Sequence, residues 1–226
     1  MTRRLALAAL LPAAMAIVAA AGNWLATVSP QAGGHTIGNP AAPVTLTEYV
    51  SYTCPHCAAF TRAAETPLAA GYVTPGRLKV EVRHLLRDPV DLAVALLVNC
   101  GPAAKYPQNH AAFMLAQPQW LPRATAASAA QRARWTSGDN GARRRAIAGD
   151  VGLYTIAERR GYSRVAADRC LADEAVATRL AAQSEAGWKV PGVTGTPAFA
   201  LNGTVLAGTH DWALLEPQLR ARYRAN

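Results

Sequence analysis

Residues 54–57 read Cys-Pro-His-Cys and lie just after the apolar-rich run Val44–Tyr52. The start of that run alternates β-branched and apolar residues, which predicts a strand, and the residues after Cys57 suit a helix. The two cysteines therefore lie where a strand ends and a helix begins. Backbone N–H groups at a helix N-terminus are unpaired and carry the positive end of the helix dipole. This position favours the thiolate, which is the reactive form of cysteine.

The two cysteines are predicted to be unequal. We expect the sulfur of Cys54 to be exposed at the helix N-terminus, and Cys57, one turn further on, to be shielded. Attack or release then occurs at Cys54, and Cys57 resolves the mixed disulfide. His56, which follows Pro55 between them, can add positive charge or a hydrogen bond to the Cys54 thiolate. A thiol pKa lowered from about 8.5 to about 3.5 would favour the reduced form by roughly 7 kcal/mol.

Two other interpretations of the cysteine pair are less favoured. Half of a zinc site would need a second close pair of ligands, and the remaining cysteines, Cys100 and Cys170, are isolated. A purely structural disulfide would close only a very small loop, which gives little chain-entropy stabilisation. A redox-active pair is therefore the favoured interpretation.

The N-terminus has the pattern of an export signal. Arg3 and Arg4 precede the apolar stretch Leu5–Val18, and the small residues Ala19–Ala21 follow it. We expect residues 1–21 to be a cleaved signal peptide. A retained single-pass anchor is the alternative, although the stretch is short and rich in alanine. The rest of the chain is then expected in the periplasm, where disulfides persist.

Composition and charge exclude some classes of protein. Hydrophobic residues make up 51% of the chain and charged residues 16%, so a real core can form and extensive disorder is not expected. The formal net charge is +9. The run Arg143–Arg145 has no interleaved aromatic residues, which favours a solvated helix face over a nucleic-acid surface.

Periodicity and turn residues predict the remaining strands and helices. Strand patterns occur in two pairs of segments, separated by a region, residues 90–187, whose patterns are helical. Asn202-Gly203 is a strong signal for a two-residue hairpin. The predicted order is a linker (22–43) with one short strand near His35–Ile37, a strand (Val44–Val50), a helix (57–70), a strand (78–84), four to six helices, two strands (198–201 and 204–207) and a helix (211–222).

A second motif lies far downstream, where Gly195-Thr196-Pro197 precedes the hairpin. Together with the Cys-Pro-His-Cys tetrapeptide and the helical region between them, it resembles the DsbA-like branch of the thioredoxin superfamily. The resemblance implies an α/β three-layer thioredoxin fold formed by residues 44–89 and 188–226. It also implies that residues 90–187 form an inserted all-helical domain.

The resemblance assigns roles to residues outside the tetrapeptide. A cis peptide at Pro197 would place the Thr196 backbone beside Cys54, where it can pair with an extended substrate strand, and would keep metal ions from the thiols. Glu48 matches the buried acidic residue that DsbA-like proteins hold beneath the disulfide, where desolvation would raise its pKa and let it relay a proton to Cys57. A rim glutamate on an exposed strand face is the alternative.

Thr196 is a departure from the best-known DsbA-like oxidases, which have valine before the cis-proline. Threonine there looks more like isomerases and some other branches. Isomerases of the DsbC type also need an N-terminal dimerisation domain, and residues 22–43 are too short to provide one. A monomer is therefore expected.

Cys100 and Cys170 both lie in the helical region. In an oxidising compartment two such cysteines are expected to pair, and a second, non-catalytic disulfide also resembles one subset of DsbA-like proteins. Two buried free thiols are the alternative.

The expected function is an exported thiol:disulfide oxidoreductase that donates the Cys54–Cys57 disulfide to folding secreted proteins. The resemblance implies reoxidation by a membrane quinone-linked partner and no metal or prosthetic group. Two alternatives stay open. One is a reductase or isomerase of the same fold, kept reduced by a membrane donor. The other is a non-enzymatic chaperone that binds Cu(I) through the two thiolates.

Overall fold

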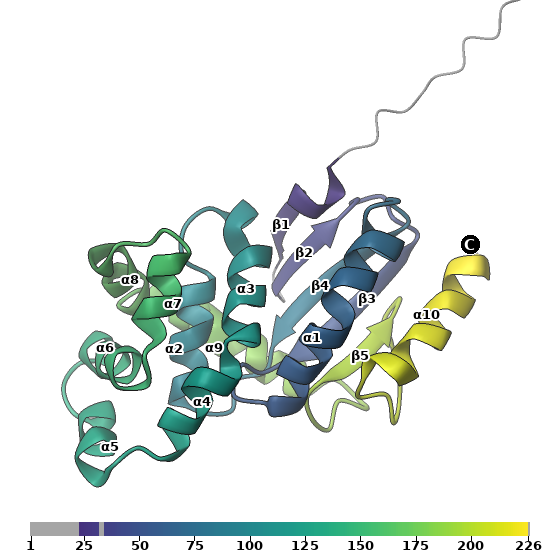
Figure 1. Cartoon of the computed structure of the whole chain (residues 1–226). Helices are drawn as coiled ribbons and strands as arrows, with labels where there is room; N and C mark the ends of the chain where they lie inside the picture. The colour runs from purple at the N-terminus through teal and green to yellow at the C-terminus, as the bar shows by residue number, and fades with distance from the viewer. Residues whose placement is uncertain (1–22, 32–33, 226) are drawn as a thin grey trace, which may run out of the picture.

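The computed structural model describes residues 23–31 and 34–225, so the predicted signal peptide lies outside the described residues. These residues contain a mixed sheet with helices on both faces (Figure 1). Its strand order is β1-β2-β4-β3-β5-β6. None of the described helices combines the length and the apolar character needed to cross a bilayer. The strands are β1 (Val28–Gln31), β2 (Gly34–Gly38), β3 (Val44–Val50), β4 (Leu78–His84), β5 (Ala198–Leu201) and β6 (Thr204–Val205).

Strands β3 and β4 form the parallel centre of the sheet, and both have the bounds predicted from sequence. They are joined by α1 (Pro55–Leu68), which continues as a short π-helix, Ala69–Val73. Six of the seven residues of β3 are buried, as expected for a strand covered on both faces. Strand β5 pairs antiparallel with β3 and places Phe199 opposite Glu48.

The predicted hairpin is present between β5 and β6. Asn202 and Gly203 have φ angles of 48° and 83°, the left-handed values that a two-residue hairpin of this kind requires. Strand β6 ends at Val205, earlier than the Ala207 predicted from sequence. The chain then turns into α10 (Trp212–Ala225), whose start is capped as predicted, because the side chain of Asp211 accepts a hydrogen bond of 2.8 Å from Leu214 N.

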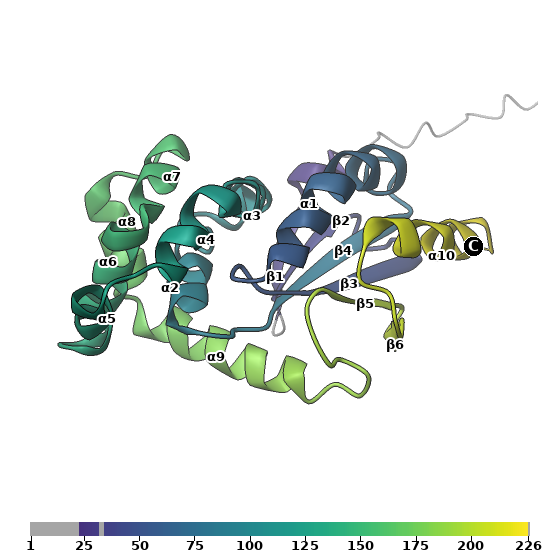
Figure 2. The same ribbon diagram turned by 60° about the horizontal axis from the view of Figure 1, so that its bottom comes forward.

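The sheet is the middle of three layers. Helices α1 and α10 cover one face, and α9 (Glu174–Trp188) covers the other (Figure 2). The rings of Phe60 on α1 and Phe199 on β5 lie 4.6 Å apart in the core between the first two layers. This arrangement confirms the predicted thioredoxin fold.

Eight α-helices lie between β4 and β5, more than the four to six predicted. The prediction was wrong because single residues divide helices that the apolar pattern joins. Gly152, with φ 82°, ends one helix and begins the next, and Ala116 alone separates another pair. The helices are α2 (Pro89–Val98), α3 (Tyr106–Leu115), α4 (Gln117–Thr125), α5 (Ala129–Thr136), α6 (Asn140–Val151), α7 (Leu153–Arg159), α8 (Arg164–Leu171) and α9.

Helix α9 runs from the helical region to the sheet, so it belongs to both (Figure 2). Its Ser184 Oγ accepts a hydrogen bond of 2.8 Å from Leu86 N, just beyond β4. A Cβ atom on Gly187 would lie 2.5 Å from Leu85 Cδ2, so glycine permits the close approach of helix and sheet at this point.

The predicted linker contains more structure than expected. Strand β1 pairs with β2, and β2 pairs with β4, so this segment extends the sheet by two strands instead of one short one. The sequence pattern missed β1 because Pro30 argues against a strand, although proline is tolerated in an edge strand. His35 on β2 is 8% exposed and stacks on Tyr106, with ring centroids 3.8 Å apart.

Candidate functional site

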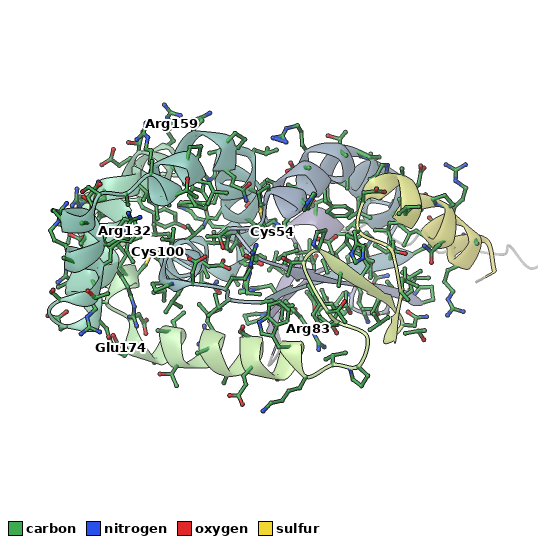
Figure 3. The ribbon with its side chains drawn as sticks, turned by 90° about the horizontal axis from the view of Figure 1, so that it is seen from below. Cys54, Arg83, Cys100, Arg132, Arg159 and Glu174 are labelled. Carbon is green, nitrogen blue, oxygen red and sulfur yellow. A yellow bond between two sulfur atoms is a disulfide. The ribbon has the colours of Figure 1, made fainter. Side chains whose placement is uncertain are left out.

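The two active-site cysteines lie where β3 ends and α1 begins, close to the helical region (Figure 3). Cys54 is the N-cap of α1 and has an extended backbone, and Pro55 occupies the first turn, where a missing N–H costs nothing. Cys57 completes that turn, and its N–H donates to Cys54 O over 3.2 Å. Both cysteines are free thiols in this structure.

Cys54 is far less exposed than predicted. Its residue surface is 3% exposed and that of Cys57 is 0%, so the prediction of an exposed Cys54 sulfur was wrong. The cover comes from distant segments: Cys54 Sγ lies 3.1 Å from Thr196 O, and Gln117 on α4 donates to Cys54 O over 2.9 Å. Pro55 and His56 remain exposed beside it. The exposed surface next to Cys54 is therefore formed by Pro55 and His56.

The pKa values of the two thiols are shifted in opposite directions. A hydrogen bond from the Cys57 side chain is the largest cause that lowers the pKa of Cys54, which is about 5. The Thr196 side chain and the N–H groups of Cys57 and His56 lower it further, against the opposing effect of burial. Burial, followed by the interaction with Cys54, raises the pKa of Cys57 well above its ordinary value. The pair thus has one thiolate and one thiol at neutral pH.

The loop facing Cys54 is held in a fixed geometry. The Thr196–Pro197 peptide is cis, and Pro197 directly precedes β5. Pro197 O lies 2.9 Å from Nδ1 of His210, which comes from the loop before α10. Because the loop is tied to the sheet on one side and to His210 on the other, it presents Thr196 to the cysteines.

Glu48 on β3 is 5% exposed, so it is not a rim residue on an exposed face. Burial raises the pKa of its carboxyl group to about 7. The carboxyl group lines a cavity of about 240 Å³ between the sheet and α1, together with Phe60, Thr61 and His110. Glu48 is therefore a buried acid that can be protonated at neutral pH.

The chain is similar to known proteins of one family. The family model described as "Thioredoxin" matches residues 31–221. The chain belongs to the thioredoxin family. Its DsbA-like character, predicted from the two motifs and the helical region between them, is confirmed at the level of family and fold.

Solved thioredoxin-family structures include two useful comparisons. A protein-disulfide isomerase from Novosphingobium aromaticivorans is 46% identical, with a TM-score of 0.80 over 84% of this chain and 97% of that one. Wolbachia pipientis alpha-DsbA1 shares the fold at 19% identity, with a TM-score of 0.67 over 84% of this chain and 90% of that one.

A protein of Rickettsia conorii with the curated name "Putative protein-disulfide oxidoreductase" is 26% identical over 168 residues, which are 74% of this chain and 52% of that protein. A Rickettsia typhi protein of the same description is also 26% identical, over 74% of this chain and 54% of its own length. The chain spans about half the length of the curated relatives it matches.

Asp91 on α2 is a residue of the active-site region that the sequence motifs did not predict. Its side chain is buried, and the residue is 1% exposed. Its carboxylate accepts hydrogen bonds from Ser51 Oγ (2.5 Å), Tyr52 N (2.8 Å) and Arg87 N (3.1 Å). A backbone hydrogen bond from Ser51 in turn lowers the pKa of the Cys57 thiol, against the larger effect of burial. Asp91 therefore holds the loop that leads into the thioredoxin-family active site. The one sequence signal was an aspartate inside an otherwise apolar helix.

A disulfide joins Cys100, just after α2, to Cys170 on α8, with an S–S distance of 1.96 Å and a Cα–Cα distance of 5.6 Å. Cys100 is 4% exposed. The bond lies within the helical region, away from the active-site cysteines of this thioredoxin-family protein (Figure 3).

Three histidines that are far apart in the sequence meet beneath the active site of this thioredoxin-family protein. His35, His84 and His110 pack with Tyr52 and Tyr106, and the ring centroids of contacting pairs lie 3.8–6.4 Å apart. Sequence spacing gave no sign of this grouping. Within the described residues, no three or more histidine, cysteine, aspartate or glutamate side chains are grouped so that they could hold a metal ion.

Proposed function

We propose that this protein is an exported thiol:disulfide oxidoreductase that donates a Cys54–Cys57 disulfide to cysteine-containing proteins. The observation that carries the proposal is the opposite shift of the two thiol pKa values, which lowers that of Cys54 to about 5 and raises that of Cys57. A stabilised Cys54 thiolate favours the reduced pair, so the disulfide form readily passes its bond to another protein.

The reaction proceeds in two exchanges. A substrate thiolate attacks Cys54 Sγ of the oxidised pair, the Cys54–Cys57 bond breaks, and Cys57 leaves with the electron pair and is then protonated. A second substrate thiolate attacks the substrate sulfur of the mixed disulfide, and Cys54 leaves as its stabilised thiolate. The substrate gains one disulfide, and the enzyme gains two electrons and one or two protons, depending on pH.

Thr196 and Pro197 serve as the substrate-binding loop in this proposal. As a thiol, Cys54 donates to Thr196 O over 3.1 Å. Once Cys54 is a thiolate or part of a disulfide, that carbonyl oxygen is free to accept an N–H from an extended substrate segment. His56 and Pro55 form the exposed edge along which the substrate approaches.

Glu48 is the proposed proton donor to Cys57. Its pKa of about 7 leaves the carboxyl group partly protonated at neutral pH, where a proton donor must be able to give and regain a proton. Cys57, whose pKa is raised by burial, needs that proton to be a good leaving group.

The proposed setting is the periplasm, reached through the N-terminal segment, with the protein acting as a monomer. The Cys100–Cys170 disulfide supports an oxidising compartment. The proposal also includes reoxidation by a membrane quinone-linked partner and needs no cofactor, because the electrons are carried by the cysteines.

The decisive experiment is the equilibrium of the Cys54–Cys57 pair with glutathione. We expect a potential near the oxidising end of the family, about −120 mV. We also expect the oxidised protein to oxidise a dithiol peptide stoichiometrically. The matched variants are Cys54→Ser and Cys57→Ser, which each remove one thiol and must abolish turnover. A potential near about −270 mV, the value of thioredoxin, would contradict the donor role.

A second candidate is disulfide isomerisation. Thr196 precedes the cis-proline, and the Novosphingobium aromaticivorans structure is described as a protein-disulfide isomerase. An isomerase must act in its reduced form, so it would refold a protein with scrambled disulfides without net oxidation. Recovery of scrambled ribonuclease in the absence of oxidant separates this activity from disulfide donation.

A further inference from the structure

The cavity of about 240 Å³ that Glu48 lines lies where the sheet, α1 and α3 meet. Helices α1 and α3 lie side by side on the same face of the sheet (Figure 1). The floor of the cavity contains Ile37, Val80, Val82 and Glu48, because Val80 pairs with Ile37 and Val82 pairs with Glu48. Paired residues of neighbouring strands point to the same face of a sheet, so the Glu48 side chain points to the face that carries the cavity.

The walls of this cavity are mostly hydrocarbon. The sheet and α1 contribute the apolar side chains of Ile37, Phe60, Ala64, Leu68, Val80 and Val82. An apolar cavity of roughly 150 Å³ is enough to hold benzene, so this one has room for an aromatic ring with a short substituent. Leu25, Glu65 and Gln108 also line the cavity and are exposed, so they form a rim through which a small molecule can enter.

The charge of the lining is opposite to that of the protein. The chain has 23 lysines and arginines against 14 aspartates and glutamates. Among the described residues, no lysine or arginine lines the cavity, whereas Glu48 and Glu65 do. His110 lines it as well and is neutral at pH 7, because burial lowers its pKa to about 4. The cavity is therefore acidic and favours a cation over an anion.

The carboxyl group of Glu48 is buried without a partner. The residue is 5% exposed, and burial is the one cause that raises the pKa of its carboxyl group to about 7. Among the described residues, no hydrogen-bond donor and no positive charge offsets that burial. Buried polar groups are normally hydrogen-bonded, so a donor supplied by a ligand would offset a cost that the protein leaves uncompensated.

We propose that this cavity binds a small organic cation, an ammonium group carried on a compact hydrocarbon body. The ammonium group donates to the Glu48 carboxylate, and the hydrocarbon body lies against Phe60, Leu68 and the valines of β4. The site is distinct from the two cysteines, and the inference does not depend on the direction in which they exchange disulfides.

Other occupants match the lining less well. Water can bond the Glu48 carboxyl group but leaves the apolar walls in contact with solvent. A purely apolar molecule covers the walls and leaves the carboxyl group without a donor. An anion meets two glutamates. A compact ammonium ion satisfies the walls and the carboxyl group together.

The test uses benzylamine, which is an ammonium ion at pH 8, and benzyl alcohol, which has the same shape and no charge. Each is titrated calorimetrically into the whole protein with the active-site thiols reduced. We expect a dissociation constant on the order of 1 mM for benzylamine, a modest affinity for so few atoms. Benzyl alcohol should bind at least about tenfold more weakly, because it lacks the charge-assisted hydrogen bond.

Glu48→Gln keeps the shape of the side chain and removes its charge. It should weaken benzylamine binding at least about tenfold and leave that of benzyl alcohol unchanged. Glu81→Gln is the matched control, because Glu81 lies between Val80 and Val82 on β4 and therefore points to the opposite face, where it bonds Thr47 and Arg83. It should leave the binding of both molecules unchanged.

Ala64→Leu tests the location of the site by a second route. Ala64 is 1% exposed and lines the cavity, so the larger side chain takes up the space of the ligand. Both molecules should then lose their binding. Glu48→Gln decides the question if this variant does not fold.

The pH dependence of binding identifies Glu48 as the partner. Between pH 6 and pH 8 its carboxyl group passes from mostly acid to mostly carboxylate, so the affinity for benzylamine should rise about tenfold. Glu48→Gln should abolish that rise, and Glu65→Gln should keep it. The titratable groups on the elements around Glu48 are His35, His84, Tyr106, His110 and Glu65, and burial lowers the pKa of each histidine and raises that of Tyr106, so these four stay neutral in this range.

Three results would each overturn the proposal. The first is no heat of binding with benzylamine at concentrations tenfold above the expected dissociation constant. The second is equal affinity for benzylamine and benzyl alcohol, which would mean that the cavity does not select a cation. The third is benzylamine binding that folded Glu48→Gln leaves unchanged, which would place the ligand elsewhere on the protein.

Discussion

Cys54 Sγ and Thr196 O lie 3.1 Å apart, although the two residues are separated by 142 positions in the sequence. The contact is made by a loop whose cis peptide precedes β5, the strand paired with the one that leads into the cysteines. The chemistry of Cys54 is therefore set by two distant segments of the chain that the sheet brings together.

Thr196→Val tests what the hydroxyl group contributes at this contact. The Thr196 side chain lowers the pKa of Cys54, so its loss should raise that pKa from about 5 by about one unit, the effect of one hydrogen bond to a charged group. The thiolate absorbance at 240 nm during a pH titration measures the shift. The potential should become more reducing by about 30 mV. Thr196→Ser keeps the hydroxyl group and should leave both values unchanged.

Glu48→Gln should make the protein more stable at neutral pH. The folded-state pKa of Glu48 is about 7, above its ordinary value of 4.5, so ionising it in the folded state opposes folding. That cost is absent below about pH 4.5 and grows as the pH rises to 7, where it reaches roughly 3 kcal/mol. Urea unfolding at pH 4 and pH 8 measures it. A stability gain equal at both pH values would contradict the buried-acid assignment.

Asp91→Ala should destabilise the protein by about 3–5 kcal/mol. The substitution leaves the buried Ser51 hydroxyl and Tyr52 N–H without their acceptor, and each unsatisfied group costs about 1–3 kcal/mol. Chemical unfolding measures the loss. The control is Asp88→Ala, which removes the cap of α2 and an exposed hydrogen bond from Thr53 Oγ1 and should cost only about 1–2 kcal/mol. Equal losses in the two variants would show that Asp91 does not hold the loop.

Replacing Cys100 and Cys170 together by serine should lower the free energy of unfolding by about 4 kcal/mol. The two residues are separated by 70 positions, and a disulfide closing a loop of that length restricts the unfolded chain by that amount. Thermal unfolding with and without reductant measures the effect. The unchanged protein should lose the same stability when reduced, and the double variant should be insensitive to reductant.

Local patterns accounted for much of the fold. The bounds of β3 and β4, the Asn202-Gly203 turn and the Asp211 cap follow from alternation, turn geometry and capping, which depend on residues close in sequence. The helical region was harder, because one left-handed glycine at position 152 divides helices that share an apolar pattern. The edge strand β1 was missed because it contains Pro30 and because the strand with which it pairs lies outside its own sequence.

The sequence by itself determined the reactive group: a Cys-Pro-His-Cys tetrapeptide at a helix start, whose backbone N–H groups favour the thiolate. Only the tertiary structure decided its environment. The burial of Cys54 under Thr196 and Gln117 and the support of its loop by Asp91 join residues from separate elements. Hydrogen bonds and desolvation act over a few ångströms in space, and sequence separation carries no record of which distant groups will meet at that range.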